Sequence, residues 1–94
     1  MSIVGMFEKP YGVGYKVYTG TVSVAGSKSI STGFSTVVSV SLTVQTTSTS
    51  KVYIPRVDSI SGGTVTVKVA DFDGTTLNVT SSDTVTVHVL IVGY

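Results

Sequence analysis

Apolar and polar residues alternate from Thr84 to Val89, near the end of the chain. Valine or isoleucine occupies every second position from Val85 to Ile91. The side chains of an extended chain point alternately to its two faces, so this pattern predicts a β-strand over residues 83–94 with one apolar face. The opposite face begins polar and ends apolar: it carries Thr84, Thr86 and His88, then Leu90, Val92 and Tyr94. The final part of the strand is therefore apolar on both faces. Both faces must be covered there, either by a second layer of the chain or by another subunit.

The same two-residue period predicts six further strands, separated by short polar turns. They cover residues 15–25, 29–34, 38–45, 51–60, 64–72 and 76–80. Gly62-Gly63 and Asp73-Gly74 are typical hairpin turns. Pro55 cannot donate a hydrogen bond to a neighbouring strand, which predicts that residues 51–60 lie at a sheet edge or contain a bulge. Within residues 15–25 the apolar positions change from odd to even at Gly20, which predicts a bulge or bend there.

Short strands joined in this way describe an antiparallel sandwich or small barrel. We predict an all-β protein with a single antiparallel β-sandwich domain of six to eight short strands over residues 15–94. Residues 1–14 are expected to form an N-terminal arm or short strand, which either folds onto its own domain or adds to a sheet edge of a neighbouring subunit. The composition agrees, because Val supplies 19 of the 94 residues and Ser plus Thr 29.

Composition also limits the kinds of partner and site that the chain can have. Charged residues make up 12% of the chain and the net charge is +1, which argues against nucleic-acid binding. There is no cysteine, so neither a disulfide nor a thiolate metal site can form. A chain of this length buries a small core, and oligomerisation often stabilises such domains. No run of residues is long enough to span a membrane, and the apolar start lacks the basic segment of a signal peptide.

Candidate chemistry is sparse. His88 is the only histidine, and the sequence identifies neither a carboxylate to orient it nor a nucleophile beside it. We therefore expect no catalytic residue, no metal site and no cofactor. Asp71-Phe-Asp73-Gly74 resembles the start of a calcium loop but lacks its later ligands, so a hairpin turn is the simpler interpretation. Asn78-Val-Thr80 matches the glycosylation pattern, which arises often by chance in a chain rich in threonine.

Tyrosines are the best candidates for ligand contact, because each offers a flat apolar ring with a polar tip. The candidates are Tyr11, Tyr18 and Tyr53. For an interface between subunits, the candidates are the residues on the second face of the last strand. These are His88, Leu90, Val92 and Tyr94.

The order of these segments resembles a known family. The segments are YTGTVSVA at residues 18–25, SISTGF at 29–34, VSVSLTV at 38–44 and VTVHVLIVG at 85–93, with Asp73-Gly74 between the last two. They resemble H-type-lectin-like β-sandwich domains, which occur at the tips of phage tail fibres and in other viral attachment proteins. The family often has a proline just before the valine strand, where this chain has Thr36-Val37. None of the family's sugar-contacting residues can be matched here, so none is carried over.

The resemblance implies a sandwich of six or seven strands that trimerises through one sheet and binds at its exposed end. With no signal peptide expected, we predict a non-enzymatic component of a virus particle, such as a fibre tip, spike or capsid-decorating protein. Its partners would be further copies of itself, other virion proteins or host-surface glycans. The alternatives are a carbohydrate-binding lectin module, or an extracellular filament subunit that donates its N-terminal strand to the next copy.

Overall fold

A computed structural model describes the backbone of residues 2–8 and 14–94 and the side chains of residues 14–94. Eight strands occur in the described residues. They are β1 (Ser2–Glu8), β2 (Gly14–Ala25), β3 (Ser27–Ser31), β4 (Val37–Gln45), β5 (Val52–Ser61), β6 (Thr64–Phe72), β7 (Leu77–Asn78) and β8 (Thr84–Gly93). This confirms the predicted all-β fold and its number of strands. Residues 2–8 of the predicted N-terminal arm form β1, which pairs with β2 of its own chain.

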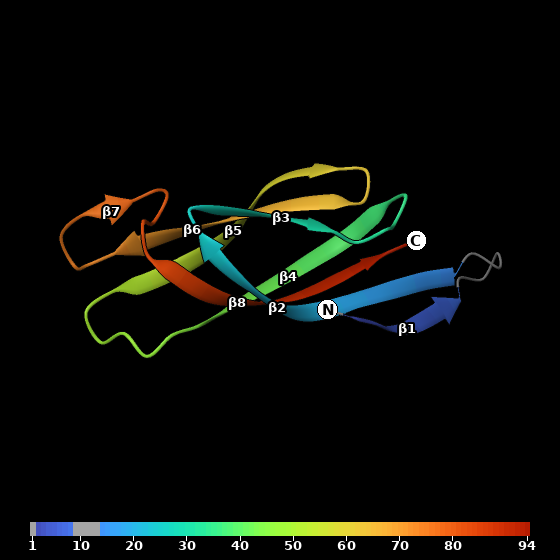
Figure 1. Cartoon of the computed structure of the whole chain (residues 1–94), viewed down its shortest axis with the longest axis horizontal. Helices are drawn as coiled ribbons and strands as arrows, with labels where there is room; N and C mark the ends of the chain where they lie inside the picture. Colours follow the sequence, from blue (N-terminus) through green and yellow to red (C-terminus); the bar gives the residue numbers. More distant parts are fainter. Residues whose placement is uncertain (1, 9–13) are drawn as a thin grey trace.

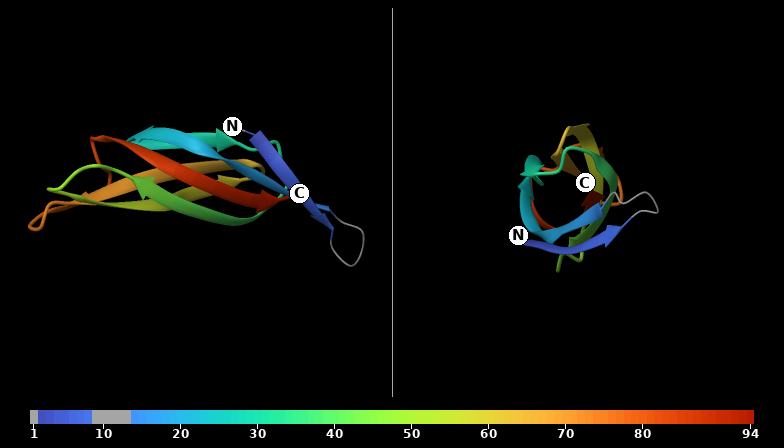
Figure 2. Two further views of the ribbon diagram at one scale, coloured as in Figure 1. Left: turned by 90° about the horizontal axis from the view of Figure 1, so that it is seen from below. Right: turned by 90° about the vertical axis from the view of Figure 1, so that its right-hand side faces the viewer.

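All strand pairs are antiparallel and follow one path, β4-β8-β2-β3-β6-β5, with β1 added to β2 and β7 added to β6. The only pair that joins β2 to β3 is Ala25 with Ser27, on either side of Gly26. Gly26 has a φ of 82°, which suits glycine, and the path turns a corner there. The corner divides the strands into two layers, β1-β2-β8-β4 and β3-β6-β5 with β7, so that the fold is a β-sandwich (Figures 1 and 2).

The core lies between the layers and is built from the valine stripes seen in the sequence. β8 occupies the middle of its layer, between β2 and β4, and β6 occupies the middle of the other layer. Their inward side chains are 0–4% exposed: Val85, Val87, Val89 and Ile91 on β8, and Val65, Val67 and Val69 on β6. A central strand has neighbours on both sides as well as an opposing layer, so its inward side chains are the most fully buried.

Three details of the prediction can be compared with the structure. The predicted bulge at Gly20 is wrong, because β2 pairs with β8 without a register shift and Gly20 lies opposite Val89. Pro55 lies on β5, which is an edge strand with a register shift between Val57 and Ser59, as predicted. The strand predicted at residues 76–80 shrinks to the two residues of β7, because no second layer covers this segment.

One end of the sandwich is closed by Phe34 and is called the phenylalanine end; it comprises Tyr18, the segment 32–36, Gly63, Gly93 and Tyr94. Phe34 is 5% exposed, and its ring packs edge-on against Tyr18 at a centroid distance of 6.4 Å. The backbone N–H and the Oγ1 of Thr32 both donate to the carbonyl of Gly63, at 2.9 and 2.7 Å. Oγ1 also accepts from the backbone N–H of Phe34.

The chain on the other side of Phe34 is held just as closely. The backbone N–H groups of Ser35 and Thr36 donate to the carbonyl of Tyr94, and the N–H of Tyr94 donates to the carbonyl of Thr36. Gly63 and Gly93 lie directly against this segment. A Cβ on Gly63 would overlap the Phe34 carbonyl, and one on Gly93 would overlap the Thr36 carbonyl and the Phe34 ring. Glycine is therefore required at both positions by close packing.

No helix within residues 2–8 and 14–94 has the length and apolar character needed to cross a membrane.

Candidate functional site

The end of the sandwich opposite Phe34 is polar and is called the polar end. It comprises Lys51, Tyr53, Asp71, Asn78, Ser81 and Asp83, which come from the starts of β5 and β8, the end of β6, and the β7 segment. Asp71 follows Val65, Val67 and Val69 on the inward face of β6 and is 1% exposed. Its carboxylate accepts hydrogen bonds from Asn78 Nδ2 at 2.8 Å and from Ser81 Oγ at 2.5 Å.

Asp83 is the second carboxylate of the polar end. It accepts hydrogen bonds from Lys51 Nζ and from the Tyr53 hydroxyl, each at 2.8 Å, through the same oxygen. The Lys51 ammonium also lies 3.7 Å from Asp71, so it bridges the two carboxylates. Ser81 completes the connection, because its hydroxyl donates to Asp71 and accepts from the backbone N–H of Asp83. The network ties β5, β6 and β8 together at one end.

These contacts keep the charged groups ionised at neutral pH. Hydrogen bonds from Ser81 and then Asn78 lower the pKa of Asp71, and hydrogen bonds from Lys51 and then Tyr53 lower the pKa of Asp83. The hydrogen bond to Asp83 is the main cause that raises the pKa of both Lys51 and Tyr53. All four pKa values therefore move away from neutral pH.

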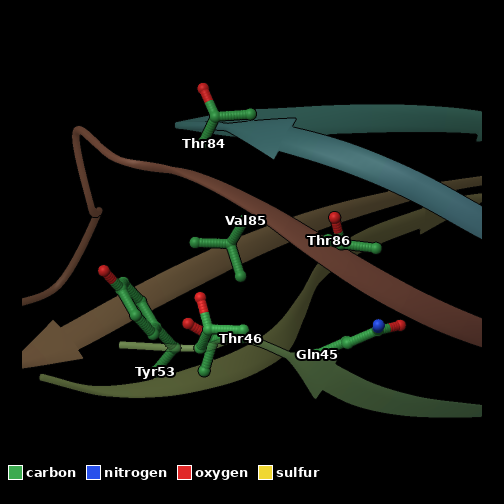
Figure 3. A pocket seen from close by; sticks show the side chains of 7 residues that line it. Gln45, Thr46, Tyr53, Thr84, Val85 and Thr86 are labelled. Carbon is green, nitrogen blue, oxygen red and sulfur yellow. The ribbon is translucent and has the colours of Figure 1, made fainter. Parts of the chain in front are cut away.

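A pocket of about 310 Å³ adjoins the network at Tyr53 (Figure 3). Its lining comes from the end of β4, the following loop, and the starts of β5 and β8: Gln45, Thr46, Thr47, Tyr53, Thr84, Val85 and Thr86. The lining offers threonine hydroxyls, one amide and one aromatic ring, and it includes no charged side chain. Groups of this kind donate and accept hydrogen bonds with a neutral hydroxylated ligand such as a sugar.

The three tyrosines predicted as ligand contacts have different positions. Tyr53 is half-buried and lines the pocket, so it remains a candidate. Tyr18 is 7% exposed in the core against Phe34, so little of its ring is accessible to a ligand. Tyr11 lies outside the described residues.

The predicted interface residues cluster on the outer face of the β2-β8-β4 layer. Cross-strand neighbours of His88 are Thr21 and Thr43, and those of Leu90 are Thr19 and Ser41. Leu90 is 42% exposed, because these small neighbours do not cover it. His88 Nε2 lies 2.6 Å from Gln45 Oε1 on the adjacent strand.

The other two predicted interface residues continue this face toward the phenylalanine end. Val92 is half-buried and lies between Val17 and Ser39. The ring of Tyr94 is half-buried and lies 6.0 Å from that of Tyr15. The structure therefore places all four predicted residues along one side of the last strand, where they are accessible to a further subunit.

The two remaining sequence motifs serve local structure. Asp73 Oδ1 accepts hydrogen bonds from the backbone N–H groups of Thr75 and Thr76, so this carboxylate closes its own turn. The amide of Asn78 donates to Asp71. In the described part of the chain, no three His, Cys, Asp or Glu side chains are grouped closely enough to hold a metal ion.

The sequence reasoning missed most of the polar end. A signal was present, because Asp71 continues the inward phase of Val65, Val67 and Val69, and a carboxylate at an inward position needs partners. The partners themselves could not be found from spacing. Ser81 lies ten positions further along the chain and Lys51 twenty positions before it, and only the strand order brings them together.

Comparison of the chain with models of known protein families, with curated proteins and with solved structures gave no match.

Proposed function

We propose that this chain is a non-enzymatic structural subunit that forms a trimer through the outer face of its β2-β8-β4 layer. The observation that carries the proposal is the exposed Leu90, which lies on the central strand of this layer toward the phenylalanine end. Val38 lies at the same end of the layer, in a bulge of β4, and is 52% exposed. A small domain gains stability when such a patch is buried against identical subunits.

The proposed setting is the surface of a virus particle, as a fibre tip, spike or capsid-decorating protein. The support is the resemblance of residues 18–94 to β-sandwich domains of viral attachment proteins. The polar end agrees with a structural role, because its charged groups are paired with each other and their pKa values lie away from neutral pH. The other virion proteins and host-surface glycans would then be its partners.

Light scattering on the purified chain tests the assembly. At micromolar concentration we expect a mass of three times 9.7 kDa, or a whole multiple of that mass where trimers associate further. Leu90→Glu places three carboxylates in the proposed contact and should abolish it, so that the mass falls below that of three chains. Leu77→Glu is the matched control, because Leu77 is 56% exposed on the other layer, and it should leave the mass unchanged. A wild-type chain that stays monomeric at these concentrations would overturn the proposal.

A second candidate function is carbohydrate binding, which the pocket beside Tyr53 favours. The polar, uncharged lining and the half-buried tyrosine suit a sugar. A glycan array with the wild-type chain provides the test, followed by Gln45→Ala and Thr86→Val. Loss of a glycan signal in both variants, with no loss in Thr21→Val outside the pocket, would support a lectin function. No sugar-specific binding by the wild type would exclude it.

A further inference from the structure

The β2-β8-β4 layer has an incomplete edge at β4. In the described residues, β4 pairs with β8 on one side and with no strand on the other, although β5 packs near it. The inward side chains of β4 show the consequence. Val40, Leu42 and Val44 are only half-buried, whereas the inward row of β8 beside them is almost completely buried. The core is therefore less completely covered along this edge than beneath β8.

The two edge strands on this side of the sandwich differ in how they discourage further pairing. β5 contains Pro55, carries the ion pair of Arg56 with Asp58, and has a register shift after Val57. Prolines, charges and bulges are the features that keep an edge strand from pairing with another chain. β4 has nine residues with the sequence VVSVSLTVQ, and contains no proline and no charged residue. Its only irregularity lies at its start, between Val37 and Ser39.

We propose that a second copy of the chain adds its own β4 to this β4, antiparallel and across a two-fold axis. The strand is complementary to itself. Antiparallel pairing of two identical strands can place the hydroxyl row Ser39, Ser41 and Thr43 beside the same row of the partner, and the apolar row beside the apolar row. No like charges meet, because β4 carries none. Each copy then covers the open side of the other's inward row.

This contact goes beyond the proposed trimer and uses a different surface. The trimer contact lies on the outer face around Leu90, and the new contact lies along the free edge of β4. A subunit that has both a three-fold face and a two-fold edge can extend an assembly in a second direction, as a shell or lattice requires. Ser41 is the cross-strand neighbour of Leu90, so cross-linking at the β4 edge is measured in the Leu90→Glu variant, in which the three-fold contact is removed.

Disulfide cross-linking in single-cysteine variants tests the edge contact, because the chain has no native cysteine. The variants are Ser39→Cys, Ser41→Cys and Thr43→Cys on β4, with Ser59→Cys on β5 as the matched control. All four positions are exposed. Under mild oxidation at micromolar concentration, and in the Leu90→Glu background, we expect at least one β4 variant to form covalent dimers at least tenfold faster than Ser59→Cys. Equal rates at β4 and β5 would overturn the proposal.

A charged residue introduced on β4 provides a second test of the edge contact, with the mass of the assembly as the readout. Ser41→Lys brings two ammonium groups close together across the axis, so it should abolish the two-fold contact while circular dichroism shows an unchanged fold. Ser59→Lys should leave the contact intact. If the trimer does not exist, the wild type still sediments as a dimer, and Leu90→Glu leaves the cross-linking rate unchanged. A Ser41→Lys variant that retains the wild-type mass would contradict the edge contact alone.

Discussion

The two ends of the sandwich are stabilised by different kinds of interaction. At the phenylalanine end, an aromatic ring fills the space between the layers, and two glycines allow the backbone to approach it closely. At the polar end, Lys51 joins two carboxylates, and the Ser81 hydroxyl links the carboxylate of Asp71 to the backbone N–H of Asp83. The first end depends on shape, and the second depends on charge and hydrogen bonding.

This difference between the two ends indicates which end of the domain responds to pH and salt. Close packing tolerates little alteration in volume, and its strength varies little with pH or salt. Paired charges near the surface contribute less, respond to pH and are screened by salt. The pocket lies at the polar end beside Tyr53. A ligand in this pocket would therefore bind at the end of the molecule that is sensitive to pH and salt. The following experiments test this contrast, beginning with the largest expected effect.

Removal of the ring at the phenylalanine end should be the most damaging change. Phe34→Ala removes a side chain that is 5% exposed and the edge-on contact with Tyr18, so we expect a loss of about 3–5 kcal/mol in the free energy of unfolding. Urea denaturation followed by circular dichroism measures it. Phe34→Leu, which retains most of the volume, should cost much less. Equal losses in the two variants would show that the ring does not fill this end.

Addition of one methyl group at the same end should have the next largest effect. A Cβ on Gly93 overlaps the Thr36 carbonyl and the Phe34 ring, so Gly93→Ala should cost about 1–3 kcal/mol through strain. Gly74→Ala is the control at the polar end, where no atom lies within 4 Å of the new Cβ and only the φ of 97° opposes it. A neutral Gly93→Ala would show that close approach is not what requires glycine at position 93.

Removal of a hydrogen-bonding group at the polar end should cost less. Ser81→Ala leaves an oxygen of Asp71 and the backbone N–H of Asp83 without their present partner, which we expect to reduce stability by about 1–2 kcal/mol. Ser82→Ala, at an exposed neighbouring position, is the matched control and should be close to neutral. Urea midpoints of the two variants give the comparison. A neutral Ser81→Ala would mean that the network does not hold this end together.

Changes in pH should affect the polar end selectively. The lowered pKa values of Asp71 and Asp83 stabilise the fold fully above their ordinary value of 3.8, and this stability is lost as the pH falls through the folded values. The raised pKa values of Tyr53 and Lys51 set the upper limit of the stable pH range. The stability that these two groups contribute is lost as the pH rises above their ordinary pKa values of 10.0 and 10.5. Stability should therefore be greatest between these limits.

Unfolding curves from pH 2 to pH 11 measure this profile. Asp83→Asn should flatten both limbs, because Asp83 is the main partner of Lys51 and Tyr53. Phe34→Leu should lower the whole curve without changing its shape. An unchanged profile in Asp83→Asn would assign the pH dependence to groups outside the network.

The smallest effect is expected midway between the two ends. On the outer face of β5 and β6, Asp58 lies 3.1 Å from Arg56 and 3.6 Å from Lys68, and all three side chains are partly exposed. Solvent screens such pairs, so Asp58→Asn should cost less than about 1 kcal/mol, and 0.5 M salt should remove most of that cost. A larger cost would place an essential ion pair outside the polar end.

The sequence predicted the strands well because their physical cause is local. Alternation of valine with serine or threonine places β4, β6 and β8 within one or two residues of their observed bounds. The prediction failed at Gly20 because Tyr15 and Val17 are apolar but lie on the outer face, and a pattern does not show which face an apolar residue occupies. The pocket was anticipated only through Tyr53, because its other walls are set by the strand order.

The central position of β8 has a kinetic consequence. Its two neighbours, β2 and β4, are not hydrogen-bonded to each other, and β8 follows both in the chain. During synthesis, β2 and β4 therefore leave the ribosome with exposed valines before the strand that joins them exists. Pairing over such long sequence separations is slow, so this layer should assemble late and nearly all at once. Until then, the uncharged β4 is the segment of the nascent chain most exposed to aggregation.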